Sequence, residues 1–201
     1  WKAHFKPLRV GRHFVIKPSW EPWDAAPDDR VIELDPGMAF GTGTHETTRL
    51  CLQLLEDTVA AGDRILDWGT GSGILSVGAG LLGASEVIAV DLDPIAVAAA
   101  AENAERNGLD AVIKAETASI QSVPAEPPFD LVLANIVADP IIAGAGEIYG
   151  HLRPGGQAIV SGIIDHREAE VVAALEGAGL TLQRALRDQD WRALLLSRDL
   201  E

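Results

Sequence analysis

The chain has 201 residues, 47% of them apolar, and a formal net charge of −14, a length that fits one α/β domain with a sizeable core. Its apolar runs are too short for a membrane helix of about 20 residues, and its acidity disfavours binding of duplex nucleic acid through phosphate neutralisation. Cys51 is the only cysteine, which excludes an internal disulfide and favours a reducing cytoplasm, while the acidic surface is compatible with a basic partner.

Residues 1–36 differ in composition from the rest of the chain. Five prolines divide this region into short extended pieces, such as 12–17 and 30–35, because proline fixes its own backbone and lacks an N–H group. Three of the five tryptophans also lie here, and we expect them to pack the region onto the core. The pattern predicts a linker or strap over residues 1–36, followed by one domain over residues 37–201.

From Thr47 onward, a helix is followed by strict alternation of strands and helices, which is typical of a parallel sheet covered on both faces. The predicted helices span about 47–59, 73–82, 93–107, 140–151 and 165–179, and the predicted strands 64–68, 86–91, 112–116, 130–135, 157–162, 181–186 and 191–197. Only four residues separate the last two strands, so these should pair antiparallel. We expect a doubly wound α/β fold with a mostly parallel, seven-stranded sheet and a C-terminal antiparallel hairpin.

The first strand of this alternation runs into a turn with three alternating glycines, Gly69, Gly71 and Gly73. Glycine lets the backbone N–H groups of a turn approach a ligand closely, and the N-terminus of the following helix favours an anionic group. Asp91 ends the next strand, where a carboxylate can accept both hydroxyls of a ribose. These features predict a site for an adenosine-containing cofactor; the alternative is an ordinary tight turn.

The spacing of the glycines distinguishes between cofactors. The dinucleotide pattern G-x-G-x-x-G requires its third glycine at the position of Ile74. Asp67 precedes the turn, and the D-x-G-x-G-x-G pattern resembles the first motif of class I methyltransferases, which use S-adenosylmethionine. A nicotinamide-dependent dehydrogenase is the alternative on the same kind of fold, and the chain shows no obvious proton donor for that reaction.

The fourth strand ends at Asn135, at the sheet edge where parallel sheets bind ligands. Its side chain can serve as an acceptor aimed at the atom that receives a methyl group; the alternative is an asparagine that satisfies turn backbone. Methyltransferases acting on planar nitrogens typically carry Asn-Pro-Pro-aromatic here, whereas this chain continues with Ile136, Val137 and Ala138. We therefore expect no aromatic stacking surface, which disfavours an adenine or glutamine acceptor and allows a flexible alkylamine.

Residues 38–48 are a second segment that indicates a ligand site. Their glycines and hydroxyl groups are typical of a loop that can fold over a ligand. Thr44 or His45 is expected near the cap of the helix that follows. The five histidines are scattered, and His45 has no partner at metal-ligand spacing, so no metal site is predicted. We also expect no catalytic histidine or cysteine.

Several of these segments together resemble the ribosomal protein L11 methyltransferase family, and the resemblance covers essentially the whole chain. The segments that carry it are residues 38–48, the glycine turn, 91–94, 135–138 and 190–192. The resemblance implies that contacts with S-adenosylmethionine fall on Thr48, Gly69, Asp91 and Asn135. Gly71 of the glycine turn completes the predicted cofactor site. Asn135 is also the predicted catalytic residue, because it would orient the acceptor amine.

The implied activity is transfer of a methyl group from S-adenosylmethionine to a lysine side chain or N-terminal amine of a basic ribosomal protein. We expect a cytoplasmic monomer without direct contact to nucleic acid or membrane. Members of the family carry an N-terminal recognition domain, whereas this chain starts at Trp1 and has Met38 as its only methionine, so we expect a fragment or processed form. The alternatives are a methyltransferase of another amine or small molecule, and a fragment that binds cofactor without methylating.

Overall fold

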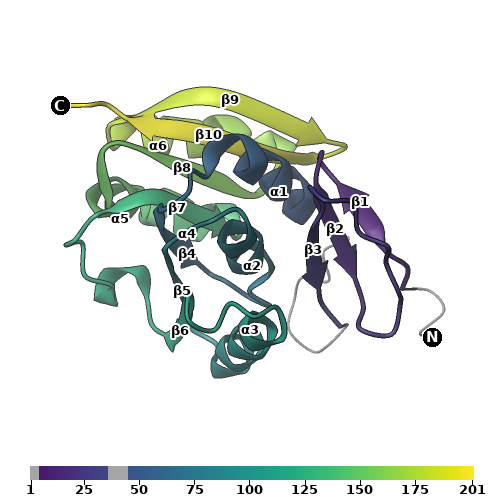
Figure 1. The fold of residues 1–201 in the computed structure, drawn as a ribbon. Coiled ribbons are helices and arrows are strands. Elements are labelled where there is room, and N and C mark those ends of the chain that lie inside the picture. Colours follow the sequence, from purple (N-terminus) through teal and green to yellow (C-terminus); the bar gives the residue numbers. More distant parts are fainter. Residues whose placement is uncertain (1–4, 36–44) are drawn as a thin grey trace.

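The computed structural model describes residues 5–35 and 45–201, arranged as Figure 1 shows. Seven strands form one sheet in the order β6-β5-β4-β7-β8-β10-β9. These strands are β4 (Arg64–Trp68), β5 (Glu86–Asp91), β6 (Ile113–Thr117), β7 (Phe129–Asn135), β8 (Leu152–Ile164), β9 (Leu180–Asp188) and β10 (Trp191–Arg198). The pairs from β6 to β8 are parallel, and β10 is antiparallel to both of its neighbours. The predicted doubly wound, mostly parallel sheet is thus confirmed, with β10 placed between β8 and β9.

Helices cover both faces of this sheet (Figure 1). They are α1 (Glu46–Thr58), α2 (Ile74–Leu81), α3 (Pro94–Arg106), α4 (Ala138–Ala143), α5 (Ala145–His151) and α6 (Glu168–Gly177). Apolar side chains of α1 and α2 share one buried cluster with the sheet, and those of α4, α5 and α6 share another. Along β7, Leu131 and Leu133 belong to the first cluster, while Val132 and Ala134 belong to the second. Such alternation on two buried faces explains why the strands are apolar throughout.

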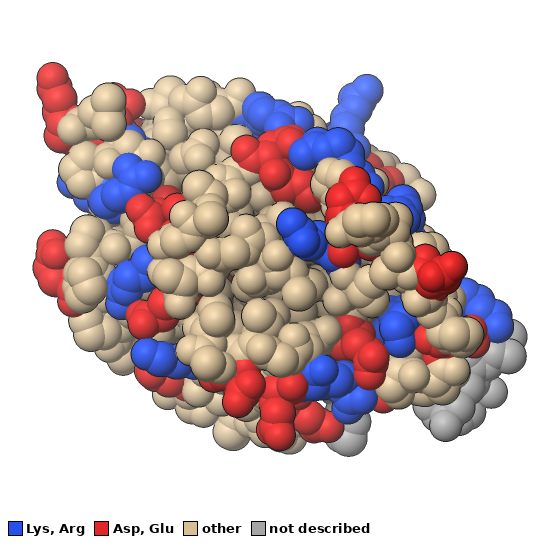
Figure 2. Space-filling view, in the orientation of Figure 1, with Lys and Arg blue, Asp and Glu red and all other residues tan. Residues whose placement is uncertain are grey.

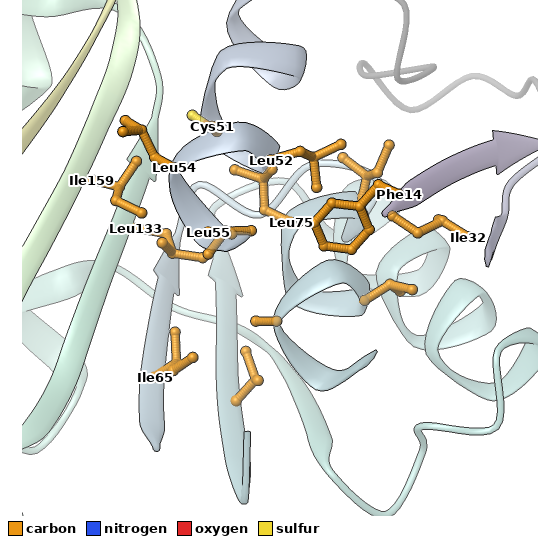
Figure 3. Close-up of a cluster of buried hydrophobic side chains, with 14 of the residues drawn as sticks. Phe14, Ile32, Cys51, Leu52, Leu54, Leu55, Ile65, Leu75, Leu133 and Ile159 are labelled. Carbon is orange, nitrogen blue, oxygen red and sulfur yellow. The ribbon is translucent and has the colours of Figure 1, made fainter. Parts of the chain in front are cut away.

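Helix α1 supplies much of the first cluster, as Figure 3 shows. Leu54 and Leu55 point toward Ile159 and Leu133 of the sheet, and each of these side chains is fully buried. Cys51 lies on the same helix, and burial raises the pKa of its thiol to about 12. The thiol therefore stays protonated and packs as a small apolar group.

A second, three-stranded sheet lies beside α1, α2 and α3 in Figure 1. Its strands are β1 (Leu8–Val10), β2 (Phe14–Lys17) and β3 (Arg30–Glu33), with β1 antiparallel and β3 parallel to β2. The extended pieces predicted in residues 1–36 thus pair with one another. Of the three tryptophans expected to pack onto the core, Trp1 lies outside the described residues, and Trp20 is half-buried and packs edge-on against Phe5. Trp23 is 37% exposed, so the expectation is wrong for this residue. Phe14 and Ile32 are buried in the core instead. The predicted boundary at residue 36 lies outside the described residues and stays a prediction.

Two polar side chains hold this small sheet against the helices. Glu56 of α1 accepts the backbone N–H groups of Arg12 and His13, both at 2.8 Å, in the turn between β1 and β2. Asn107, the residue after α3, accepts the N–H of Glu33 at 2.9 Å and donates to its carbonyl at 3.0 Å. The amide of Asn107 thereby bonds both backbone groups of Glu33, as a neighbouring strand would. The edge of β3 is satisfied at this residue without a further strand.

Two predicted helices differ from the structure. The helix expected over residues 140–151 is divided at Gly144 into α4 and α5, where a Cβ atom would lie 2.6 Å from the ring of Trp68. The helix expected over residues 165–179 begins later, at Glu168. Residues Asp165–Arg167 form a 3₁₀ turn, and α6 begins after it without a side-chain cap. Gly144 lies against the distant Trp68, and the N–H of Asp165 donates to the carbonyl of the distant Asp190 at 2.7 Å. Local patterns report neither contact.

Replacing Glu56 with alanine tests how the small sheet is held. The change removes the acceptor of two backbone N–H groups, so we expect the free energy of unfolding to fall by about 2 kcal/mol in urea titrations. Asp57→Ala is the matched control, because Asp57 forms only partly exposed ion pairs with Arg12 and Arg184 and should cost less than about 1 kcal/mol. Equal losses in the two variants would contradict the role of Glu56.

Candidate functional site

The carboxyl ends of β4, β5 and β7 open into a cavity of about 480 Å³. The reversal of strand order lies here, since β5 and β7 flank β4 on opposite sides, and such points are the usual ligand sites of parallel sheets. The cavity is lined by His45, Thr47, Trp68, Gly69, Gly71, Asp91, Leu92, Ala118, Asn135, Ile136, Val137, Pro140, Gly162 and Trp191. Four of the five predicted site residues, Gly69, Gly71, Asp91 and Asn135, therefore line the same cavity.

The turn after β4 is shaped by three glycines in the left-handed region, Gly69 (φ +73°), Gly71 (φ +57°) and Gly73 (φ +81°). The N–H groups of Gly69 and Thr70 donate to the carbonyl of Val90 at 2.8 and 2.9 Å. The N–H of Gly71 donates to Asp91 at 3.0 Å. The turn uses these three N–H groups to bind the end of β5, so none of the three remains for a phosphate.

The carboxylate of Asp91 is held in place by two backbone N–H groups. Its Oδ2 accepts from Gly71 and its Oδ1 accepts from Asp93, each at 3.0 Å. A carboxylate oxygen has two lone pairs, so each oxygen keeps a free acceptor position at the cavity wall. The geometry leaves Asp91 able to accept a pair of hydroxyl groups, as the sequence suggests.

Asp67 lies under the same turn and is only 2% exposed. Its Oδ2 accepts from Ser76 Oγ at 2.7 Å and from Thr70 Oγ1 at 2.8 Å. Burial raises the pKa of Asp67 to about 6, the two hydroxyl groups lower it in part, and the charge of Asp91 raises it further. The carboxyl group thus supports the turn from beneath and carries negative charge at neutral pH.

A smaller cavity of about 40 Å³ adjoins the larger one and shares Gly69, Gly71 and Asn135 with it. Thr48, the fifth predicted site residue, lines this smaller cavity together with Asp67 and Ser72. Ser72 Oγ is buried and has no hydrogen-bond partner within the described residues. A buried hydroxyl without a partner is costly, so the small cavity is suited to the polar end of a ligand.

Asn135 lies where the two cavities meet, at the end of β7. The next residue, Ile136, donates its N–H to the carbonyl of Ser161 at 3.1 Å. Gly162 has φ +83°, and a Cβ atom there would lie only 2.2 Å from the carbonyl oxygen of Ile136. Close backbone packing against β8 thus holds the Asn135 loop. The Asn135 side chain makes no hydrogen bond to any of the described residues, which leaves its amide available to a ligand.

The cavity has aromatic walls that the sequence analysis did not predict. Trp68 and Trp191 line it, and the ring of His45 packs edge-on against Trp191 with centroids 5.0 Å apart. The absence of an aromatic residue after Asn135 therefore does not leave the site without a stacking surface, and that expectation is wrong. Trp191 starts β10, more than 50 residues along the chain from Asn135. Only the insertion of β10 next to β8 brings its ring to the site.

Helix α1 begins beside the cavity with His45 as its N-cap, as expected. His45 Nδ1 accepts the N–H of Thr47 at 3.1 Å, and its ring also forms part of the cavity wall. The rest of the predicted loop, residues 38–44, lies outside the described residues. Within residues 5–35 and 45–201, no group of three His, Cys, Asp or Glu side chains is placed to hold a metal ion.

The charges of the site select among ligands. Asp67 and Asp91 lie on either side of the glycine turn, and none of the described residues that line the two cavities is a lysine or arginine. Such walls favour a ligand with hydroxyl groups or positive charge over one with several phosphates. They thereby disfavour a dinucleotide cofactor, which carries a pyrophosphate group.

The sequence matches one protein family over nearly its whole length. The family model described as Ribosomal protein L11 methyltransferase (PrmA) matches residues 1–199. The protein named ribosomal protein L11 methyltransferase in Geobacter sulfurreducens is 50% identical over 195 residues, which cover 97% of this chain and 64% of that protein. A crystal structure titled ribosomal protein L11 methylase, from Lactobacillus delbrueckii subsp. bulgaricus, is 34% identical with a TM-score of 0.88, over 97% of this chain and 100% of that one.

The fold alone does not determine the reaction. The crystal structure of the [4+2]-cyclase SpnF aligns with 77% of this chain and 82% of its own, with a TM-score of 0.65 but only 16% identity. The assignment to a family therefore depends on the family model and on the matches at higher identity. No helix among the described residues is both long and apolar enough to cross a membrane.

Replacing Gly162 with alanine tests the packing that holds Asn135. The added Cβ atom would clash with the backbone of Ile136 and force a left-handed conformation on alanine, so we expect the free energy of unfolding to fall by about 2 kcal/mol or more. Gly146→Ala in α5 is the control, because no atom lies within 4 Å of the new methyl group and a helical alanine should stabilise by up to about 1 kcal/mol. A tolerated alanine at 162 would contradict the close packing.

The pH dependence of unfolding tests the environment of Asp67. The pKa of Asp67 is near 3.8 in the unfolded chain and about 6 in the folded one. The folded state therefore binds the proton more tightly. The stability gained from this proton is complete below pH 3.8 and is lost as pH rises through 6. In Asp67→Asn, the amide oxygen can still accept from Thr70 and Ser76 without titrating. We expect the free energy of unfolding of this variant, relative to wild type, to rise by about 3 kcal/mol between about pH 3 and pH 7. A difference in the free energy of unfolding that stays constant over this pH range would show that the pKa of Asp67 is not raised in the folded chain.

Proposed function

We propose that this chain, which belongs to the ribosomal protein L11 methyltransferase (PrmA) family, transfers methyl groups from S-adenosylmethionine to amino groups of a ribosomal protein. The chain spans about 64% of the length of the curated relatives that it matches, so their activity is carried over as a proposal. The observation that carries it is the position of Asn135, whose side chain lies between two joined cavities and makes no hydrogen bond to the described residues.

The residues present fit S-adenosylmethionine. Asp91 would accept the ribose hydroxyls, with the adenosine beside Gly69 and Gly71 in the larger cavity. The amino-acid end would occupy the smaller cavity, where Ser72 Oγ lacks a partner and Thr48 and Asp67 lie in the wall. The negative charge of Asp67 favours an ammonium group there, and the absence of phosphates in this ligand agrees with the occupied N–H groups of the glycine turn. When bound, the ligand supplies a methyl group on a positively charged sulfur.

The reaction needs a neutral amine. A lysine side chain has a pKa near 10.4, so forming the neutral amine at pH 7 costs about 5 kcal/mol. Burial in the apolar part of the cavity lowers the pKa of an ammonium group, because desolvation disfavours its charge. The lining supplies such an environment through Ile136, Val137 and Pro140 beside Trp68 and Trp191. A strong base is therefore not required in this chain.

Asn135 would hold the amine in the reactive orientation. Its amide oxygen can accept an N–H of the substrate and thereby direct the nitrogen lone pair toward the methyl group. Alignment of this kind contributes several kcal/mol to the lowering of a barrier, up to about 7–11 in the best model systems. The packing of Gly162 against Ile136 supports the role, because it holds the loop that carries the amide.

The choice of a protein substrate is supported by the names of the relatives and by charge. The relatives are named for ribosomal protein L11, and the net charge of −14 attracts a basic polypeptide more than a nucleic acid. A ribosomal substrate and a single, buried cysteine favour action in the cytoplasm.

The direct experiment is mass spectrometry of purified ribosomal protein L11 after incubation with the chain and S-adenosylmethionine. Absence of added methyl groups, with cofactor bound, would leave a cofactor-binding fragment or a methyltransferase for another amine.

Asp91→Asn tests the ribose contact. The variant retains an oxygen for one backbone N–H but loses charge and acceptor positions, so we expect affinity for S-adenosylmethionine to fall roughly 10- to 100-fold in calorimetric titrations. Asp93→Asn is the control, since Asp93 caps α3 and asparagine caps helices equally well. Unchanged affinity in Asp91→Asn would remove the proposed ribose contact.

Asn135→Ala separates catalysis from cofactor binding. Loss of the amide leaves the glycine turn and Asp91 in place, so we expect turnover to fall by about 100-fold while the dissociation constant of the cofactor changes much less. Turnover is measured by methyl transfer to the ribosomal protein, and affinity by calorimetry on the same preparation. Wild-type turnover in this variant would show that Asn135 does not orient the acceptor.

A further inference from the structure

An exposed valine stands at the rim of the site. Val137 lines the larger cavity, yet 67% of its surface is accessible to solvent. It follows Asn135 and Ile136 and forms the N-cap of α4, so its position is set by the backbone packing against Gly162. Leu92 lines the same cavity and is 74% exposed, so more than one apolar side chain of the wall is exposed, as at a surface that another molecule covers.

The substrate amine can enter only the part of the larger cavity that the cofactor leaves open. The inference depends on the proposed function, in which the cofactor lies along Gly69, Gly71 and Asp91. Leu92 and Ala118 lie next to Asp91, on the side of the cofactor. On the side of Asn135, the lining comes from the β7–α4 connection, from Pro140 in α4, from Gly162 in β8 and from Trp191 at the start of β10. Trp68 and the start of α1 complete the wall. The entrance for the substrate is therefore bounded by Val137 and Trp191, two apolar side chains that can contact the methylene groups of a lysine.

Acidic side chains lie immediately outside this entrance. Asp139 is two residues beyond Val137, and its side chain is 81% exposed. Arg167 donates to Asp139 at 2.6 Å and to Glu170 at 2.8 Å, so one guanidinium group faces two carboxylates. The three groups leave one net negative charge at the rim. Figure 2 shows acidic and basic side chains interspersed over the face in view, so overall acidity does not by itself mark a docking place there.

We propose that the rim formed by Val137, Asp139 and Trp191 is a docking surface for a basic, lysine-bearing segment of the substrate polypeptide. Val137 and Trp191 contact the alkyl stem of the lysine that enters the cavity. Asp139, with the excess negative charge of its cluster, attracts the cationic side chains that flank that lysine in a basic segment. The rim thus gives this part of the chain a direct role in choosing the amine.

Direct binding tests the rim without requiring catalysis. The probe is a fluorescently labelled, lysine-rich peptide, titrated with the chain in the presence of S-adenosylhomocysteine and followed by anisotropy. We expect binding that weakens as salt is added, because the contacts at the rim are partly ionic and exposed. Val137→Ser should weaken it about fivefold through lost apolar contact, and Asp139→Lys about fivefold or more through charge reversal.

Matched variants away from the rim serve as controls. Glu102→Lys reverses the charge of an exposed acid that also pairs with an arginine, and Leu200→Ser removes an exposed apolar side chain that lines a different groove. Both should bind the peptide as the wild type does. Equal weakening by Asp139→Lys and Glu102→Lys would overturn the proposal, because net charge alone would then explain binding.

The outcomes also separate the rim from the proposed function. If intact ribosomal protein is methylated while wild type and both rim variants show the same KM for it, the rim proposal is wrong and the function stands. If the peptide binds and the rim variants weaken that binding, but no methyl transfer to the ribosomal protein occurs, the rim stands and the proposed function fails. A rim role further predicts a raised KM for the protein substrate with unchanged affinity for the cofactor, a split that a loss of folding would not produce.

Discussion

The hydrogen bonds between the glycine turn and the end of β5 are the interaction on which the site depends. Gly69 and Thr70 donate to Val90, and Gly71 donates to Asp91, so the backbone of one strand end is bound to the next. Left-handed glycines make this possible, because other residues would be strained there. The consequence is a wall that presents a carboxylate instead of N–H groups, and therefore a preference for hydroxyl groups and positive charge over phosphate.

The two acidic groups of this wall have different surroundings. Asp91 is held by backbone N–H groups and faces the cavity, whereas Asp67 is buried beneath the turn with a pKa raised to about 6. The charge of Asp91 adds to the rise in the pKa of Asp67, after the larger effect of burial. Two carboxyl groups so placed attract a positively charged ligand.

Asn135 depends on a different constraint, the contact of two backbones. Gly162 lets β8 approach Ile136 closely, and the N–H of Ile136 is satisfied by Ser161, so the loop that carries the amide has little freedom. The cavity is then completed by β10, which places Trp191 against His45 and opposite the end of β7. Described residues from seven separate parts of the chain thus line one cavity.

The sequence by itself determined the alternation of strands and helices, the ends of β4 and β5, the glycine turn, and the grouping of Asp91 with Asn135 at one edge of the sheet. These follow from local preferences and from the geometry of parallel sheets, which hold wherever a chain alternates in this way. The tertiary structure alone decided the division of the helix at Gly144, the use of the turn's N–H groups and the aromatic wall from Trp191. Each of these depends on contacts between residues far apart in the chain, which a local pattern cannot encode.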